Sequence, residues 1–191
     1  MLQDLENPTL RDLHRRARRL SLEFEALAGG LGPGQLAWSP ASGSWGIAEC
    51  LQHLSVTAAR SESELQRALA RGRRGRSLAP SLWRVPLGRW LIEAAGARAG
   101  SRPLRCPREL EPGRAAPENA LARFQTGHSR LLALLEAADG LDLDCLRVRT
   151  PAHPLVRVRL GEAFELAVAH AERHLAQARR VRADPRFPAG P

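Results

Sequence analysis

The sequence predicts an all-α protein whose main element is a four-helix bundle. Four segments repeat apolar residues at the spacing of an amphipathic helix. Hydrophobic residues make up 43% of the 191 residues and aromatic residues only 4%, so the core would consist mainly of leucine, alanine and valine, which favours helices. No strand pattern is convincing, because residues 156–160 alternate but are few and have no obvious partner strand.

The first two predicted helices are joined by a loop rich in glycine and proline. The first runs over about residues 10–28 and stops at the glycine pair 29–30. The connecting loop follows through residues 32–40. The second helix begins near Gly46 and ends at about residue 70, with Glu49 at the position of a capping-box acid.

The third and fourth predicted helices complete the bundle. The third starts after Pro117 and stops at Gly140, and the fourth covers residues 161–183. Residues 185–191 follow as a loose C-terminal tail. We therefore expect a single bundle domain over residues 1–184.

A long connection over residues 71–116 separates the second helix from the third. It is long enough to carry the chain along the whole bundle, so the third helix can run parallel to the second. Within it, residues 82–95 predict a short extra helix, with Trp83 and Trp90 packing over the bundle.

The net charge of +9 is concentrated in this connection, because residues 67–114 hold twelve arginines and three acidic residues. A basic loop of this kind is more often solvated or in contact with anions than a reader of nucleic acid. No nucleic-acid-binding motif accompanies it. Nucleic-acid binding through the arginine-rich segment 71–114 is therefore the least favoured alternative.

The chain has no sign of a membrane span or of secretion. No run approaches the ~18 apolar residues of a spanning helix. The N-terminus lacks the basic start and apolar run of a signal peptide. Three widely spaced cysteines do not suggest a disulfide framework. We expect a cytoplasmic protein.

Two histidines four residues apart occupy the stripe of the fourth helix that the helical period assigns to the core. That stripe contains the following residues: Ala163, Leu166, Ala167, His170, His174, Gln177 and Val181. Glu162 and Glu172 fall on the opposite side. Burying two imidazoles is costly unless each has a partner. The pair is therefore either hydrogen-bonded within the core or shares a metal ion.

The spacing of His170 and His174 suits two adjacent ligands of a first-row metal. It does not match the metalloprotease motif His-Glu-x-x-His, because Glu172 lies about 200° around the helix from His170. Glu172 therefore cannot be the general base of that mechanism. The pair alone is a weak signal, since this spacing occurs by chance on many helices.

A third histidine, His53, lies at the edge of the apolar stripe of the second helix. The polar residues Glu49, Thr57, Arg60 and Glu64 share its side. An apolar stripe bordered by a polar strip is typical of one wall of a cleft between helices.

Two segments resemble the signatures of the DinB/YfiT-like family. WGIAECLQHL at residues 45–54 is similar to its second-helix signature, and HAERHLAQ at residues 170–177 is similar to that of its fourth helix. The His153-Pro154 pair and the proline-rich stretch around Pro107 and Pro112 also resemble members of the family. One departure is Gly46, which replaces the serine or threonine often found there.

The resemblance implies a four-helix bundle of up-down-down-up topology, in agreement with the long second connection. It further implies a divalent metal ion held by three histidines, which correspond here to His53, His170 and His174. Zinc, nickel and iron all remain open, because availability and geometry rather than affinity order select the metal.

Three neutral imidazoles leave an open coordination position, which is the pattern of catalytic metal sites. The family includes thiol-dependent S-transferases, isomerases and metal-dependent hydrolases. We therefore expect a metal-dependent hydrolase or a low-molecular-weight-thiol S-transferase acting on a small molecule. The alternative is a non-catalytic, stress-related bundle protein stabilised by its metal. A homodimer is left open.

Four further residues are candidates for roles around the metal. Gln177 follows His174 on the same face and could orient a water or a ligand imidazole. Glu49 could accept a hydrogen bond from His53, although a helix-capping role is favoured. His128 is more readily explained as a satisfied core histidine, and His153 could line the mouth of the pocket.

Overall fold

The protein is described by a computed structural model over residues 5–75, 86–96, 106–112, 117–151 and 153–190. In chain order its elements are α1 (Pro8–Ala28), α2 (Pro33–Ala37), α3 (Ile47–Ala70), α4 (Pro86–Ala95), a 3₁₀ turn (Arg108–Leu110), a second 3₁₀ turn (Pro117–Asn119), α5 (Ala120–Ala137), β1 (Arg147–Thr150), β2 (His153–Arg159) and α6 (Leu160–Arg182).

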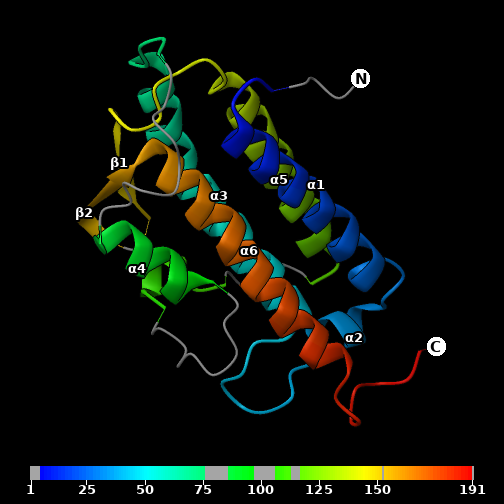
Figure 1. The fold of residues 1–191 in the computed structure, drawn as a ribbon. Helices are drawn as coiled ribbons and strands as arrows, with labels where there is room; N and C mark the ends of the chain where they lie inside the picture. Colours follow the sequence, from blue (N-terminus) through cyan, green and yellow to red (C-terminus); the bar gives the residue numbers. More distant parts are fainter. Residues whose placement is uncertain (1–4, 76–85, 97–105, 113–116, 152, 191) are drawn as a thin grey trace.

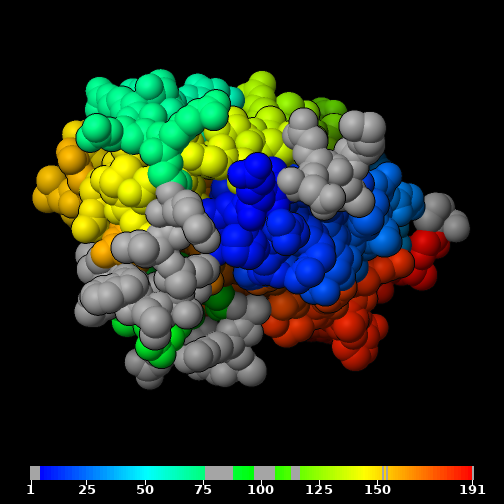
Figure 2. Space-filling model, turned by 45° about the horizontal axis from the view of Figure 1, so that its top comes forward, coloured from blue at the N-terminus to red at the C-terminus, as the bar shows by residue number. Residues whose placement is uncertain are grey.

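The four long helices α1, α3, α5 and α6 pack together as a bundle (Figure 1). In the space-filling view of Figure 2, α1 lies between α5 and α6 on one face of the molecule. The predicted four-helix bundle is confirmed. Each long helix begins and ends within a few residues of its predicted bounds.

Leucine, alanine and phenylalanine side chains from all four helices form the core. Within it, the rings of Phe24 of α1 and Phe124 of α5 pack against each other, with centroids 4.6 Å apart. Asn7 caps the start of α1, because its side chain accepts hydrogen bonds from the amides of Thr9 (2.9 Å) and Leu10 (3.3 Å).

Polar pairs along the helices show which turns are neighbours. Between α1 and α6, Arg16 pairs with Glu172 at 2.8 Å and Glu23 pairs with Arg179 at 3.2 Å. Between α3 and α5, Ala58 lies against Gly127, and Glu62 pairs with Arg130 at 3.0 Å. Between α1 and α5 the order reverses, with His14 near Glu136 and Ala17 near His128.

A small antiparallel sheet corrects the purely helical prediction. Val148 of β1 pairs with Val158 of β2, and each of these valines is 2% exposed. The partner strand was missed because β1 is only four residues long and alternates arginine with single buried residues. A second correction concerns residues 33–37, predicted as loop, which form α2 with Leu36 buried.

Glu162 was expected on the exposed side of the fourth helix and is instead buried. Its carboxylate accepts a hydrogen bond from the amide of Arg159 at 2.9 Å, which caps the start of α6. Gly88 of α4 covers the same carboxylate so closely that a Cβ at this glycine would overlap it. The α4 helix therefore approaches α6 over a glycine.

The long connection is described only in part. Its helix α4 agrees with the later part of the predicted residues 82–95, whereas Trp83 lies outside the described residues. Trp90 is 56% exposed. Many arginines of segment 71–114 also lie outside the described residues. None of the helices in the described part is long and apolar enough to cross a membrane.

Candidate metal centre

The α6 helix has two apolar faces, and the histidines lie on the one that borders a cavity. The core side of α6 is formed by the following residues: Leu160, Phe164, Val168, Leu175 and Ala178. The stripe predicted to be buried lines the cavity instead, through Ala163, Leu166, Ala167, His170, His174 and Gln177. Val181 of that stripe joins the core, and Ala163 and Ala167 are partly buried and pack against it. The predicted core face is therefore only partly core and mainly a cavity wall, because helical periodicity does not distinguish the two.

The start of α3 places His53 opposite these residues. Gly46 precedes the helix and packs against the Trp38 carbonyl so closely that a Cβ there would overlap the carbonyl oxygen. Glu49 closes the first turn by accepting hydrogen bonds from the amide of Gly46 (2.8 Å) and the hydroxyl of Ser39 (3.1 Å). The glycine that departs from the family signature thus has a steric reason.

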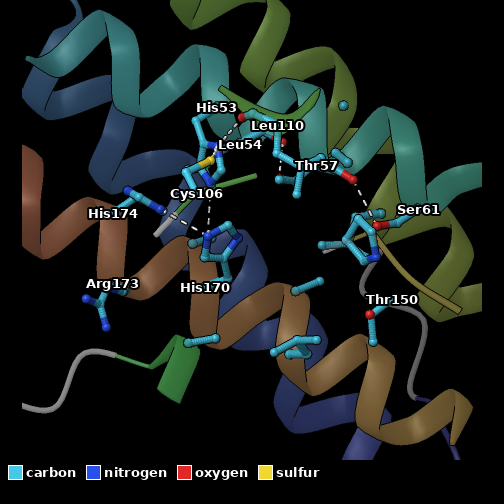
Figure 3. A pocket seen from close by; sticks show the side chains of 18 of the residues that line it. His53, Leu54, Thr57, Ser61, Cys106, Leu110, Thr150, His170, Arg173 and His174 are labelled. Atoms are coloured by element: carbon cyan, nitrogen blue, oxygen red, sulfur yellow. Dashed lines mark hydrogen bonds between the residues drawn. The ribbon is translucent and has the colours of Figure 1, made fainter. Parts of the chain in front are cut away.

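Three imidazoles converge between α3 and α6 (Figure 3). The Nε2 atom of His170 lies 3.1 Å from Nε2 of His53 and 3.0 Å from Nε2 of His174. All three potential ligand atoms lie within 4.8 Å of one another. The structure therefore brings together the three residues that the resemblance singled out, in an arrangement that could hold one metal ion.

A backbone carbonyl assigns the protonation of His53. Its Nδ1 lies 2.6 Å from the carbonyl oxygen of Leu110, in the first 3₁₀ turn. A carbonyl only accepts, so Nδ1 carries the proton and Nε2 of the neutral ring presents its lone pair to the cluster. Apart from the proline-rich stretch around Pro107, no sequence pattern indicates this contact.

The three nitrogens cannot all be satisfied by one another. If Nε2 of His170 is protonated, it can donate to the Nε2 lone pair of His53. In that state Nε2 of His170 cannot also accept a hydrogen bond from Nε2 of His174. If it is unprotonated, two lone pairs face each other between His53 and His170. A shared cation resolves this conflict, because it accepts all three lone pairs.

Burial keeps the cluster neutral. It lowers the pKa of His170 to about 3 and that of His174 to about 2, with the neighbouring histidines and Arg173 adding smaller effects. Burial also lowers the pKa of His53. Nδ1 of His174 is buried without a hydrogen-bond partner among the described residues. Neutral imidazole is the form that binds metals.

An aromatic ring and a thiol complete the surroundings of the three histidines, and no sequence pattern indicates either role. Trp45 stacks on His174 with centroids 5.7 Å apart and lies 4.8 Å from the ring of His53. The Cys106 Sγ lies 3.8 Å from Nδ1 of His53. Burial, followed by the charge of Glu111, raises the pKa of this thiol.

The two helper candidates line the cavity without contacting His53. The carboxylate of Glu49 caps α3, and the Nδ1 proton of His53 goes to Leu110 instead. Gln177 lines the cavity beside His174. Of the polar strip predicted on α3, Glu49, His53 and Thr57 line the cavity, whereas Arg60 and Glu64 lie outside its described lining.

The two remaining candidate histidines, His128 and His153, lie in different parts of the molecule. His128 lines the cavity outside the three-histidine cluster, and its Nε2 lies 2.8 Å from the Ala17 carbonyl oxygen. Burial lowers its pKa, so the ring is neutral. His153 is exposed at the start of β2, and its Nδ1 accepts a hydrogen bond from the amide of Leu155 at 3.3 Å. It lies outside the described lining of the cavity.

The cavity itself has a volume of about 980 Å³ and extends well beyond the histidines. Its walls come from α3, α4, α5, α6, both strands, the first 3₁₀ turn and residues 43–45 before α3. This volume is at the upper end of the range of small-molecule sites, roughly 300–1,000 Å³. The arrangement can therefore bind a metal ion at one side and a small organic molecule beside it.

Comparison with known proteins places the fold. A family model described as the DinB superfamily matches residues 15–178. Among solved structures, YfiT from Bacillus subtilis is similar over 95% of this chain and 90% of its own, at 15% sequence identity and a TM-score of 0.58. That protein is described as a probable metal-dependent hydrolase with an unusual four-helix bundle topology. No curated protein matches the chain.

Proposed function

Since the chain belongs to the DinB superfamily, we propose that it is an enzyme in which His53, His170 and His174 hold a divalent metal ion for the hydrolysis of a small molecule. The observation that carries this proposal is the convergence of three Nε2 atoms at 3.0 and 3.1 Å from the central one. The similarity to a protein described as a metal-dependent hydrolase supports it.

The donor set suits a divalent first-row ion with an open position. Three neutral nitrogens leave the ion its full charge and at least one free coordination site. Such an ion supplies Lewis acidity, which polarises a substrate carbonyl and lowers the pKa of water. Zinc, nickel and iron each accept imidazole ligands.

The chain's own residues orient the ligands and shape the site. The Leu110 carbonyl holds His53 in the tautomer whose Nε2 is free. Trp45 covers the rings of His53 and His174 and restricts access of water from that side. Gln177, on the cavity wall, is proposed to orient the reacting water. Glu172 takes no part, because it pairs with Arg16 on the opposite side of α6.

A thiol S-transferase is the second candidate, and the size of the cavity favours it. A space of about 980 Å³ accommodates a substrate and a low-molecular-weight thiol together. Thiolate is a good ligand for the same ions. A screen with small bacterial thiols and electrophiles separates this activity from ester or amide hydrolysis.

The finer features of the fold are also proposed. Helix α3 runs parallel to α5, and α1 runs parallel to α6, whereas α1 and α5 run antiparallel. These directions support an up-down-down-up order of the four long helices. We assign residues 1–184 to this one domain. The segment after it is not loose throughout, because Phe187 packs against Trp38 with ring centroids 5.4 Å apart.

Elemental analysis of the purified protein tests the metal. One equivalent of zinc, nickel or iron per chain is expected, falling at least tenfold in His53→Ala, His170→Ala and His174→Ala. The matched control is His153→Ala, an exposed histidine that should leave the metal content unchanged. Wild-type protein that neither contains nor takes up a divalent metal overturns the proposal.

Activity in the same variants separates catalysis from a structural role. The enzyme proposal expects the three alanine variants to stay folded by circular dichroism and to lose turnover. Variants that unfold instead would favour the non-catalytic metal-binding protein.

A further inference from the structure

The cavity has a second polar region on the side away from the metal ligands. Figure 3 shows Ser61 and Thr150 at that side, with Thr57 between them and the histidines. Thr57 and Thr150 are 7% and 6% exposed. Ser61 follows His53 by eight residues, so the cavity runs about 12 Å along α3.

All three hydroxyl protons in this region are already donated to backbone carbonyls. Thr57 donates to Leu54 at 3.0 Å, and Ser61 donates to Thr57 at 2.8 Å. Thr150 donates to the carbonyl of His153 at 3.2 Å. Each oxygen keeps a lone pair, so the hydroxyls face a ligand as hydrogen-bond acceptors.

His128 adds a fourth acceptor from the opposite helix. Its Nε2 donates to the Ala17 carbonyl at 2.8 Å, because a carbonyl cannot donate in return. The neutral ring then carries a lone pair on Nδ1. The neighbouring Gly127 lies against Ala58, which places this turn of α5 beside the turn of α3 that carries Thr57 and Ser61.

The net charge of the cavity lining favours neither an anionic nor a cationic ligand. Its described lining contains three acidic and three basic side chains: Glu49, Glu62, Glu111, Arg130, Arg149 and Arg173. Hydrogen bonding from the buried groups therefore decides what binds at the remote side. A site built to receive hydrogen bonds rejects ligands that lack a donor there, because its buried acceptors are then left unpaired.

We propose that Thr57, Ser61, Thr150 and His128 form a subsite that selects substrates carrying an N–H donor, an amine or an amide, at the end remote from the metal. This inference rests on the proposed function for the position of the reacting end. A carboxylate at the remote end is disfavoured, because it brings only acceptors to a region whose hydroxyl protons are already donated.

Three hydroxamates of matched length test the selectivity on the zinc-loaded protein by calorimetry. They are 6-aminohexanohydroxamate, heptanohydroxamate and 6-carboxyhexanohydroxamate, which differ only in an amine, methyl or carboxylate end. The amine should bind about tenfold more tightly than the methyl compound, as expected for one hydrogen bond to a charged group. The carboxylate should bind more weakly than either.

Matched valine variants locate the subsite. In the double variant Thr57→Val and Thr150→Val, the preference for the amine should fall to less than threefold. The control is Thr126→Val, an exposed threonine of α5 whose hydroxyl donates to the Ala122 carbonyl in the same way. It should keep the full preference. Equal affinity of all three hydroxamates for the wild type, or an unchanged preference in the double variant, overturns the inference.

A metal-independent measurement separates the two proposals. Hexylamine and hexanoate are titrated into the metal-free protein, and the NMR signals of Thr57 and Thr150 are followed. Hexylamine should shift them at a lower concentration than hexanoate. If the protein takes up no metal but this preference is present, the proposed function fails and the subsite stands. If both compounds act equally, the subsite fails whatever the metal result.

Discussion

His53 and Leu110 are joined by a 2.6 Å hydrogen bond from the imidazole Nδ1 to the backbone carbonyl. The bond connects α3 to a 3₁₀ turn that lies far along the chain, in the long connection between α3 and α5. The tautomer of one candidate metal ligand thus depends on a segment that contributes no ligand itself. Partners of this kind are worth about 10–100-fold in metal affinity.

Leu110→Ala should therefore weaken zinc binding about tenfold while all three histidines remain. The Leu110 side chain is 3% exposed, and its truncation loosens the turn that presents the carbonyl. Competition with a chromophoric chelator measures the affinity. Leu20→Ala is the control, since Leu20 is 2% exposed in α1 and lies outside the cavity lining. Both variants should lose about 2–4 kcal/mol of stability. Equal zinc affinity in the two would contradict the prediction.

Gly46→Ala should lower the free energy of unfolding by about 2–3 kcal/mol, because the added methyl group overlaps the Trp38 carbonyl oxygen. Urea denaturation followed by circular dichroism measures the change. Gly34→Ala in α2 is the matched control, since a Cβ there meets no atom within 4 Å. It should be neutral or stabilising by up to ~1 kcal/mol. A tolerated Gly46→Ala would show that the loop before α3 can move away.

Glu49→Ala should destabilise the protein by about 1 kcal/mol, the usual effect of losing a helix cap. Glu49→Gln should cost less, because the amide oxygen can still accept from the Gly46 amide. Exposed Glu25 of α1 provides the control, and Glu25→Ala should change stability by no more than about 0.5 kcal/mol. Metal content should stay the same in all three variants. Loss of metal in Glu49→Gln would instead make this carboxylate part of the metal site.

The metal-free protein should become less stable as the pH falls below about 6.5. The pKa values of His170 and His174 are lowered in the fold, to about 3 and about 2, from an ordinary value of about 6.5. Between these limits the unfolded chain binds more protons, so acid favours unfolding. Above about pH 7 the two histidines contribute no pH dependence.

Urea denaturation between pH 4 and pH 8 measures this effect as a difference between variants. His174→Leu should show a flatter profile than the wild type. The exposed histidine supplies the control, and His153→Leu should leave the slope unchanged. Identical slopes in the wild type and His174→Leu would contradict the predicted protonation.

The helices could be predicted because each carries several apolar residues at a regular period. The hairpin could not, because β1 contributes only Val148 and Thr150 to the interior. The period also misled the interpretation of α6, where small and polar residues line a cavity at the same spacing as a core face.

Only part of the candidate site could be predicted from the sequence. His53, His170 and His174 lie on regular helices, and the resemblance singled them out. The contributions of Leu110 and Cys106 come from a segment without periodicity, and one of them is a backbone atom that no residue pattern encodes. Burial of Glu162 depends on a helix that passes over it at Gly88.

One face of α6 packs in the core and stabilises the fold, and another face lines the cavity and can contact a ligand. Phe164, Val168 and Leu175 hold the helix in the core, whereas Ala163 and Ala167 pack at its edge and line the cavity. Because the two alanines also pack at the edge of the core, a larger side chain there changes the shape of the chamber while the main core residues stay in place. The wall that shapes the ligand space is therefore built largely from residues other than those that anchor the helix.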